Sequence, residues 1–258
     1  MRTALIGHTG FVGNNLKQQY EFTDFYNSKN YKEMRDQEFD LVVCAGVSAV
    51  KWMANKEPET DLANINALEE VLASVKVKQF ILISTIDVYP VTLAKAEDFD
   101  CSSIENHAYG THRLKFETFC DKHFSNCITV RLPGLFGNGL KKNVIFDLLH
   151  DNCLEMINVN SSFQYYYLKY LWQDIQKAIK NNINVINLFT EPVPTHDIFT
   201  QFFPNKLVGK EAVPEGHYDL YTKYAELWGN TGHYIYTKTE MLQQLAEFIE
   251  EYNAQQET

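Results

Sequence analysis

Residues 7–13 read GHTGFVG, and this glycine turn decides the fold that the sequence predicts. The apolar run TALI at 3–6 is typical of a buried strand, while Phe11, Val12 and Leu16 begin an apolar helical face. Glycine permits a tight turn and a close approach of backbone N–H groups, and the positive end of the following helix stabilises negative charge. The stretch predicts a pyrophosphate site, with an ordinary turn as the alternative for such a string taken alone.

Composition places the chain among ordinary globular proteins. Its 258 residues are 45% hydrophobic and 22% charged, which suits one α/β domain or a nucleotide-binding core with a smaller lobe. The net charge of −10 argues against a nucleic-acid partner, which needs clustered Lys and Arg. No apolar signal region opens the chain and no stretch has the length of a membrane span, so we expect a cytoplasmic location and no membrane contact. The five cysteines lack a metal-type spacing, and we expect free thiols and no bound metal.

Strand-like runs alternate with helical stretches through the first half, which favours a parallel sheet covered by helices on both faces. After Pro133 the apolar pattern becomes irregular, although residues 185–189 still indicate a strand that rejoins the sheet. We therefore expect a nucleotide-binding domain over residues 1–135 and a small substrate-binding lobe over 136–258. The expected strands of the first half are residues 3–6, 23–26, 40–44, 79–84 and 127–132, and the expected helices are 12–19, 61–75, 109–123 and, at the end of the chain, 239–252.

Three further stretches join the glycine turn in one pattern: FILISTIDVY at 80–89, YGTHRLKFE at 109–117 and VRLPGLFG at 130–137. Together they resemble the extended short-chain dehydrogenase/reductase family, the NAD-dependent epimerases, dehydratases and reductases of nucleotide sugars. The likeness is specific in the first half of the chain and looser in the second. It implies an α/β fold with a Rossmann-type doubly wound parallel sheet, a small C-terminal lobe and a bound NAD(P).

The resemblance implies that Thr85 and Tyr109 flank the reacting carbon. A hydride that joins or leaves a carbinol carbon requires a proton to join or leave its oxygen. A phenol can carry that proton if a nearby cation and the oxidised nicotinamide lower its pKa. A hydroxyl such as that of Thr85 would position the substrate oxygen and the phenol.

The family pattern is Tyr-x-x-x-Lys, and here Arg113 stands four residues after Tyr109. Residues four apart share a helix face, so Arg113 takes the place of the lysine, whereas Lys115 lies well round the helix. A guanidinium can lower the phenol pKa and bind ribose hydroxyls, but it cannot pass on a proton as an ammonium can. His112, three residues after Tyr109, could act at the same site, and the alternative is that it is a histidine exposed to solvent.

Cofactor choice depends on the end of the second strand, where an acidic residue would favour NAD. Asn27, Ser28 and Lys29 stand there, and an amide, a hydroxyl and a cation suit a 2′-phosphate. We expect NADP, with NAD as the second choice and a plain loop as the alternative. The full set of expected cofactor contacts is Gly7, Thr9, Gly10, Phe11, Val12, Gly13, Asn27, Ser28, Lys29, Ala45, Gly46, Asn64, Ser84, Tyr109, Arg113, Pro133 and Gly134.

For several of these residues there is an alternative explanation that involves no ligand. Packing explains Ala45 and Gly46 nearly as well as a cofactor does, and Asn66 competes with Asn64 for the place of a family asparagine that braces the site. Residues 141–143 follow a turn where related proteins receive the nucleotide diphosphate, a solvated charged turn being the alternative. Substrate candidates in the rest of the chain are Trp52 and Met53, which could also belong to the core, and Gln164 and Tyr165, which stand where many relatives carry a basic residue.

The leading functional hypothesis is an NADP-dependent oxidoreductase, epimerase or dehydratase that acts on a nucleotide sugar or related polyol by hydride transfer. Tyr109 would be the general acid/base, Thr85 its hydrogen-bonding partner, and Arg113 an electrostatic tuner and ribose clamp. The alternative is a sensor or scaffold of the same fold that binds NAD(P) without turning it over, because Arg113 replaces the lysine and a basic residue is missing at 164–165. A homodimer is typical of the resemblance.

Overall fold

The computed structural model describes residues 1–209 and 213–256, which divide into two units. Unit 1 comprises Met1–Val91, Asp98–Leu132 and Lys169–Asn187. Unit 2 comprises Thr92–Glu97, Pro133–Leu168 and the described part of Leu188–Thr258. The expected domains were residues 1–135, rejoined by a strand near 185–189, and residues 136–258, and the segment that belongs to unit 1 in the structure is Lys169–Asn187.

A six-stranded sheet with the order β2-β1-β3-β4-β5-β9 forms the centre of unit 1, and every neighbouring pair is parallel. The pairing of β9 with β5 confirms the strand expected near 185–189. Buried apolar runs form these strands because helices cover both faces. The bounds are β1 Thr3–Ile6, β2 Asp24–Tyr26, β3 Glu38–Cys44, β4 Lys76–Thr85, β5 Cys127–Leu132 and β9 Val185–Asn187.

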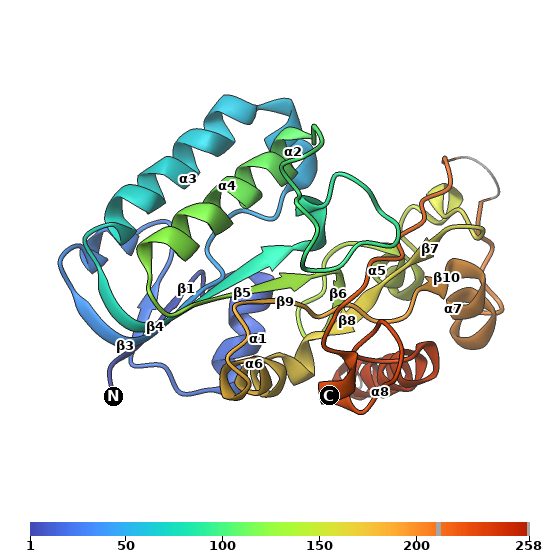
Figure 1. Cartoon of the computed structure of the whole chain (residues 1–258). Coiled ribbons are helices and arrows are strands. Elements are labelled where there is room, and N and C mark those ends of the chain that lie inside the picture. The colour runs from blue at the N-terminus through green and yellow to red at the C-terminus, as the bar shows by residue number, and fades with distance from the viewer. Residues whose placement is uncertain (210–212, 257–258) are drawn as a thin grey trace. The chain divides into compact units, whose positions relative to one another are not determined.

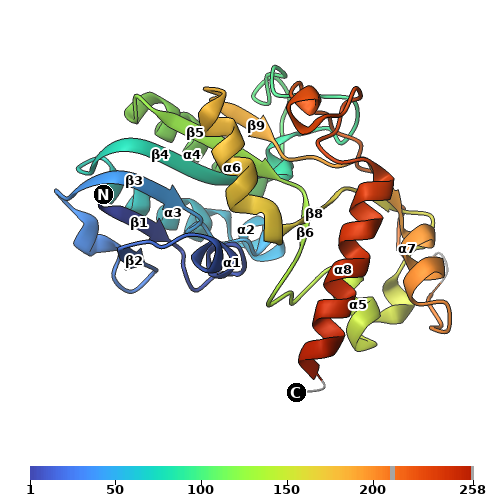
Figure 2. The ribbon, with the colours of Figure 1, turned by 90° about the horizontal axis from the view of Figure 1, so that it is seen from below.

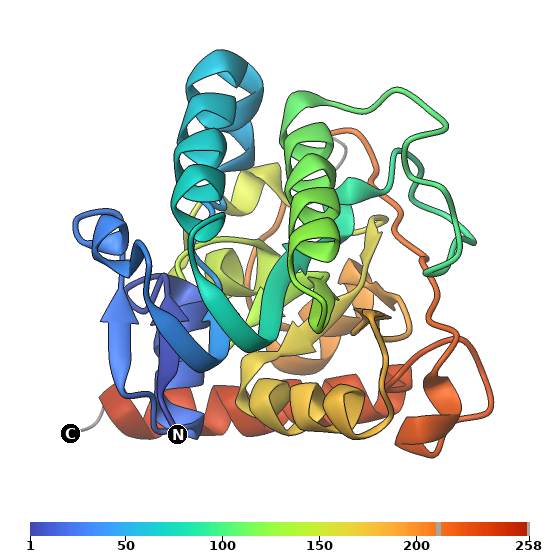
Figure 3. The same cartoon turned by 60° about the vertical axis from the view of Figure 1, so that its left-hand side comes forward.

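Helices α1 (Phe11–Gln19) and α6 (Leu171–Lys180) cover one face of this sheet (Figures 1 and 2). Helices α2 (Lys51–Lys56), α3 (Pro58–Leu72) and α4 (Ala108–His123) cover the other, and α3 lies beside α4 (Figure 3). The expected helix over 61–75 starts earlier, because Pro58 suits the first helical position. Only the short turn η1 (Tyr31–Met34) separates β2 from β3, while η2 (Ile86–Val88) follows β4. The predicted doubly wound α/β class is confirmed.

The strand order reverses at β1, which has β2 on one side and β3 on the other. In open α/β sheets, ligands bind outside the carboxyl ends of the strands at such a switch point. Gly7 follows β1 there and Ala45 follows β3.

Unit 2 is built from short strands and helices around aromatic side chains. Phe136 stacks on Tyr167 with ring centroids 4.9 Å apart, and Phe248 packs on both rings. Strands β6 and β8 pair in parallel, and β7 and β10 pair antiparallel. No helix in the described residues is both long and apolar enough to cross a bilayer. The elements are β6 Gly134–Phe136, α5 Val144–His150, η3 Leu154–Met156, β7 Ser162–Phe163, β8 Tyr165–Tyr167, β10 Val193–Pro194, α7 Thr195–Phe202, η5 Ala225–Trp228 and α8 Lys238–Gln256, with η4 Leu168–Tyr170 at the junction with unit 1.

Candidate functional site

The glycine turn has a backbone that only glycine fits at two points. Gly7 has a φ of +83°, and a Cβ there would lie 2.4 Å from the carbonyl oxygen of Ala45. A Cβ on Gly13 would lie 2.2 Å from the carbonyl oxygen of Gly7. Helix α1 begins directly after Gly10, and no described side chain forms a capping hydrogen bond at its N-terminus. Its first-turn amides and positive end therefore fit the predicted pyrophosphate.

Ala45 and Gly46 lie next to the glycine turn for a packing reason. The N–H of Ala45 donates to the carbonyl of Ile6 at 2.9 Å. A Cβ on Gly46 would lie 2.6 Å from Cγ2 of Ile6. Close approach to β1 thus explains the small residues, and their contact with a cofactor stays a prediction, as does that of the exposed Thr9.

The loop after β2 is tied to the glycine turn by a histidine that the sequence argument did not use. Nδ2 of Asn27 lies 3.2 Å from Nε2 of His8, and Oδ1 of Asn27 accepts from the N–H of Lys29 at 2.9 Å. Ser28 and Lys29 are exposed. A hydroxyl and a cation therefore remain open to solvent at the place where a 2′-phosphate was predicted.

Tyr109 stands at the start of α4, where two side chains fix the helix. Oδ1 of Asn55 accepts from the N–H of Tyr109 at 2.9 Å, and Nδ1 of His107 accepts from the N–H of Gly110 at 3.0 Å. Burial raises the pKa of the Tyr109 phenol, although the charge of Arg113 and the nearby Thr85 hydroxyl act in the opposite direction. The phenol is therefore protonated at neutral pH, and helix α4, which carries Tyr109, packs against the turn η2 that follows Thr85.

Arg113 is buried and committed to partners within unit 1. Its two terminal nitrogens bind the carboxylate of Asp61, with Nη2 to Oδ1 at 2.9 Å, and Nη2 also donates to the carbonyl of Ser48 at 2.6 Å. The guanidinium carbon lies 3.9 Å from the centroid of the Tyr109 ring. The predicted neighbourhood of Tyr109 and Arg113 is present, and both terminal nitrogens expected for a ribose clamp already have partners, while Nε has none among the described residues.

Asp61 is a residue that the sequence argument missed. Nδ1 of His112 lies 2.7 Å from its Oδ2, so the carboxylate faces two basic side chains of α4. Burial raises the pKa of Asp61, but the hydrogen bonds from Arg113 and His112 outweigh it and the net shift is downward. Asp61 is therefore charged at neutral pH and neutralises Arg113. This also gives His112 a partner in place of the solvated position considered above.

A second ion pair lies beside Thr85. Nζ of Lys51 is 2.6 Å from Oδ1 of Asp87. The backbone N–H of Asp87 donates to Oγ1 of Thr85 at 3.1 Å, and that hydroxyl donates to Oδ2 of Asp87 at 3.4 Å. Lys51 and Asp87 thus connect the expected catalytic hydroxyl to a cation from α2.

Ser84 points into a buried polar network. Its hydroxyl donates to Glu117, whose carboxylate pairs with Arg131 at 2.7 Å. Nη1 of Arg131 donates to the hydroxyl of Tyr89 at 2.9 Å, and Nδ2 of Asn187 donates to the same oxygen at 2.8 Å. The network joins β4, α4, β5 and β9, so the Ser84 hydroxyl has a structural partner and its contact with a cofactor stays a prediction.

Three solved structures are similar to the chain along most of its length. The dTDP-4-dehydrorhamnose reductase of Bacillus anthracis, in complex with NADP, has a TM-score of 0.72 and 14% identity over 97% of this chain and 99% of its own. The UDP-glucose 4-epimerase of Thermotoga maritima, with UDP-glucose, has a TM-score of 0.69 and 16% identity over 88% and 91%. The UDP-glucuronic acid 4-epimerase of Bacillus cereus, in complex with NAD, has a TM-score of 0.67 and 19% identity over 89% and 90%. The chain shares its fold with nucleotide-sugar reductases and epimerases.

The predicted resemblance to the extended short-chain dehydrogenase/reductases is thus confirmed as a likeness of fold. No protein-family model matches the chain, and no curated protein matches it in sequence.

Four other candidate residues of unit 1 lie at the surface, while Phe11 and Val12 of the glycine turn are half-buried. Asn64 is exposed, and the exposed Asn66 accepts a hydrogen bond from Lys115. Trp52 and Met53 are 65% and 45% exposed, so the suggestion that this pair belongs to the core is wrong. Their role in a sugar pocket stays a prediction.

The predicted residues of unit 2 have mostly local partners. The N–H of Gly134, which follows the buried Pro133, donates to the carbonyl of Gln164 at 3.0 Å. The side chain of Gln164 is buried, with Nε2 bonded to the carbonyls of Thr190 and Leu220.

Residues 141–143 divide into two exposed lysines and one capping asparagine. Lys141 and Lys142 are exposed. Oδ1 of Asn143 accepts from the N–H of Phe146 at 3.1 Å and so caps α5, while its Nδ2 donates to Leu135. Tyr165 is buried, and burial raises the pKa of its phenol. Structural roles therefore explain why Asn143 and Tyr165 stand at these positions, while the binding of a ligand by Lys141 and Lys142 stays a prediction.

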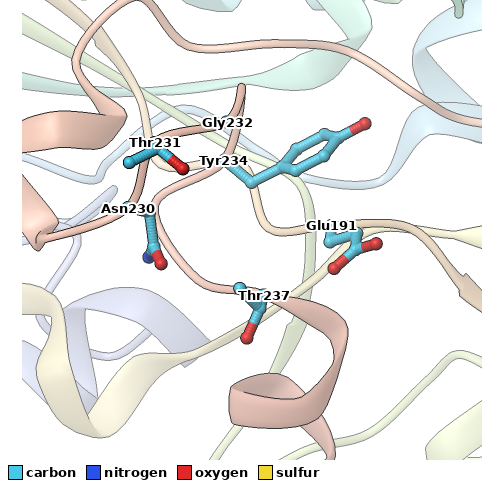
Figure 4. Close-up of a pocket in the computed structure, with 6 residues that line it drawn as sticks. All are labelled: Glu191, Asn230, Thr231, Gly232, Tyr234 and Thr237. Atoms are coloured by element: carbon cyan, nitrogen blue, oxygen red, sulfur yellow. The ribbon is translucent and has the colours of Figure 1, made fainter.

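A polar pocket in unit 2 lies at the start of α8 (Figure 4). The hydroxyl of Tyr234 donates to Asp219 at 2.6 Å, and that of Thr237 donates to Glu240 at 2.8 Å. Glu191 accepts from the N–H of Lys238 at 2.7 Å. These bonds fix the entry to the helix, and the pocket contains none of the predicted site residues. Its lining is Glu191, Asn230, Thr231, Gly232, Tyr234 and Thr237.

Proposed function

We propose that the chain binds NAD(P), with NADP preferred, and acts as an oxidoreductase, epimerase or dehydratase on a nucleotide sugar or related polyol. One observation carries the proposal: the glycine turn and Thr85 stand at the carboxyl edge of the same parallel sheet, and helix α4, which begins with Ala108 and Tyr109, packs against the turn η2 directly after Thr85. That edge is where open α/β sheets bind ligands. The NADP, NAD and UDP-glucose named for the similar structures support the choice of cofactor and substrate class.

Each residue would have a distinct part in this chemistry. A bound nicotinamide would supply or accept the hydride. Tyr109 would give its proton to the substrate oxygen or take one from it, while Thr85 holds the phenol. Arg113 would favour phenolate formation from its place over the ring. The glycine turn would hold the pyrophosphate, and Lys29 the 2′-phosphate.

Titration with NADPH and NADH, followed by nucleotide fluorescence, tests the cofactor. Gly10→Ala should weaken binding by about tenfold, about 1.4 kcal/mol, because the added methyl group would take up space where the pyrophosphate is proposed to approach the start of α1. The protein itself can accept this methyl group, since Gly10 is exposed and a Cβ there would lie 3.3 Å from its nearest described neighbour. Gly232→Ala is the matched control, since its Cβ would meet nothing within 4 Å. Lys29→Glu should weaken NADPH more than NADH. Failure of the wild type to bind either nucleotide contradicts the proposal.

Turnover of dTDP-4-dehydrorhamnose with NADPH, and of UDP-glucose with NAD, tests the reaction. Tyr109→Phe should lower kcat by about 10²–10⁴-fold without weakening cofactor binding. Tyr31→Phe, on the turn η1, is the control. A turnover unchanged by Tyr109→Phe would remove Tyr109 as the acid/base.

A sensor or scaffold is the second candidate, and the commitment of Arg113 to Asp61 and Ser48 favours it. Arg113→Lys separates the two: hydride transfer that is kept or gained supports an enzyme. Tight cofactor binding without transfer to any nucleotide sugar supports the sensor. The cytoplasmic location and the homodimer stay predictions.

A further inference from the structure

The first turn of α4, which carries Tyr109, is held by two side chains from different parts of unit 1. Nδ1 of His107, the residue before the helix, accepts from the N–H of Gly110 at 3.0 Å. Oδ1 of Asn55, on α2, accepts from the N–H of Tyr109 at 2.9 Å. The first N–H groups of a helix have no partner within the helix. These two bonds therefore fix the place at which α4 begins.

The same turn is packed tightly against η2, the turn that follows Thr85. A Cβ on Gly110 would lie 2.2 Å from the carbonyl oxygen of Asp87 and 2.3 Å from Nδ2 of Asn106. That amide nitrogen donates to the same carbonyl oxygen at 2.9 Å. Backbone therefore lies directly on backbone here, and a movement of Gly110 would carry the neighbouring Tyr109 away from the strand end.

A histidine can cap a helix only in its neutral form. The usual residues at this position are Asn, Asp, Ser and Thr, whose side-chain oxygens accept hydrogen bonds at neutral pH. Nδ1 of His107 accepts only when it carries no proton, and the neutral ring then has its proton on Nε2. A protonated ring would set a donor against the N–H of Gly110 and a positive charge against the positive end of the helix. The cap on α4 therefore depends on the protonation state of His107.

The groups around His107 keep its ring neutral at pH 7. Burial and the charge of Lys51 lower the pKa of His107, and Arg113 acts in the same direction. Asp87 opposes them, with its Oδ1 3.9 Å from Nε2, and the ring of Tyr109 has its centroid 6.3 Å away. The net shift is downward. The cap is therefore complete above the pKa of the unfolded chain, near 6.5, and is lost as pH falls through the lower folded pKa.

We propose that neutral His107 is a positioning residue for Tyr109, and that its protonation loosens the first turn of α4 and lowers turnover in acid. This inference rests on the proposed acid/base role of Tyr109. Asn55 holds the same turn at every pH, because its amide does not titrate, so acid loosens the turn while the rest of the helix remains. The acid limb of the kcat profile then comes from an imidazole that acts through Tyr109.

The amide group of Gly110 reports on the cap without substrate or cofactor. In the wild type we expect its 1H–15N signal to shift as the His107 ring titrates. Its protection from hydrogen exchange, corrected for the intrinsic rate, should fall by about fivefold on protonation. His107→Asn should keep the cap and remove this pH dependence, whereas His107→Ala should lower the protection at every pH. The matched control is His123→Asn, at the other end of α4, which should titrate like the wild type.

Turnover over the same pH range connects the cap to Tyr109. The kcat of the wild type should fall in acid with the apparent pKa of the Gly110 signal, and His107→Asn should lose that limb. Asn55→Ala should lower kcat by about tenfold at every pH, because the acid/base is displaced. Asn55→Asp keeps an acceptor for the N–H of Tyr109 and should restore most of the loss.

Two results would overturn the inference. One is a Gly110 signal that stays constant while the His107 ring titrates. The other is an acid limb of kcat that is unchanged in folded His107→Asn, with His107→Ser deciding the matter if the asparagine variant does not fold. Either result leaves the proposed function standing, since that depends on cofactor binding and on turnover of Tyr109→Phe.

Discussion

Two ion pairs flank Tyr109 and differ in their surroundings. The side chains of Asp61 and Arg113 are 9% and 5% exposed, whereas those of Asp87 and Lys51 are 17% and 39% exposed. The buried pair forms a two-pronged contact that ties α3 to α4, whereas Nζ of Lys51 meets Oδ1 of Asp87 at a place nearer to water. The same charge chemistry therefore ties two helices together in a buried place and stays close to water in the other.

The largest expected effect comes from breaking the buried pair. Asp61→Asn should lower the free energy of unfolding by about 3–5 kcal/mol, because Arg113 is left as an uncompensated buried charge. Urea denaturation at pH 7 measures the loss. Asp87→Asn should cost about 1 kcal/mol or less by the same measurement. Equal losses in the two variants would erase the contrast between the pairs.

Arg113→Lys sharpens the comparison by keeping the charge and removing the fork. We expect a loss of about 2 kcal/mol, since an ammonium cannot reach both Asp61 and Ser48 with the same geometry. The control is Arg35→Lys, because Arg35 pairs with Glu70 at the surface, with 44% of its side chain exposed. A loss no greater than that of the control would mean that the fork contributes nothing.

Acid should act on the buried pair through Asp61. Its pKa is lower in the folded protein than in the unfolded chain, so the folded state binds fewer protons at this group. This stability is complete above the unfolded pKa, near 4, and is lost as pH falls through the folded pKa. Thermal unfolding between pH 6 and pH 3 should therefore show a steeper decline in the wild type than in Asp61→Asn. Parallel curves would contradict the assignment.

The smallest effect is expected at Lys51. Lys51→Met should change the free energy of unfolding by about 1 kcal/mol or less, because a half-exposed pair gains little over its hydration. Any difference should shrink in about 1 M salt, where the screening length is about 3 Å. A larger loss of unfolding free energy that does not depend on salt would mean that the Lys51–Asp87 pair stabilises the fold as the buried Asp61–Arg113 pair is expected to do.

The sequence was sufficient to predict the sheet of unit 1, because its strands are continuous apolar runs bounded by turn residues. It also placed Tyr109 beside Arg113, since four residues make about one helical turn. It missed Asp61 and Lys51, which come from α3 and α2 and meet α4 only when the helices pack together. Asp87 stood two residues past Thr85 in the quoted motif, so attention to acidic residues near the strand end would have found it.

Unit 2 was harder to predict. Its strands contain only two or three residues, too few for alternation to show. The strand β7 and the partner β10 are separated by a helix and a return of the chain to unit 1. Only α8 has a long enough apolar repeat to be recognised in advance, and it was.

Unit 1 cannot be completed during synthesis until its late segment, Lys169–Asn187, has been made. Trp172 of this segment packs on Tyr20 with ring centroids 4.3 Å apart, and β9 closes the edge of β5. Until residue 187 has left the ribosome, the longer strand β5 is the uncovered edge of the sheet, the kind of surface on which wrong strand pairing and aggregation begin. Chains cut short soon after Leu132 should therefore be clients of chaperones and proteases rather than small stable nucleotide binders.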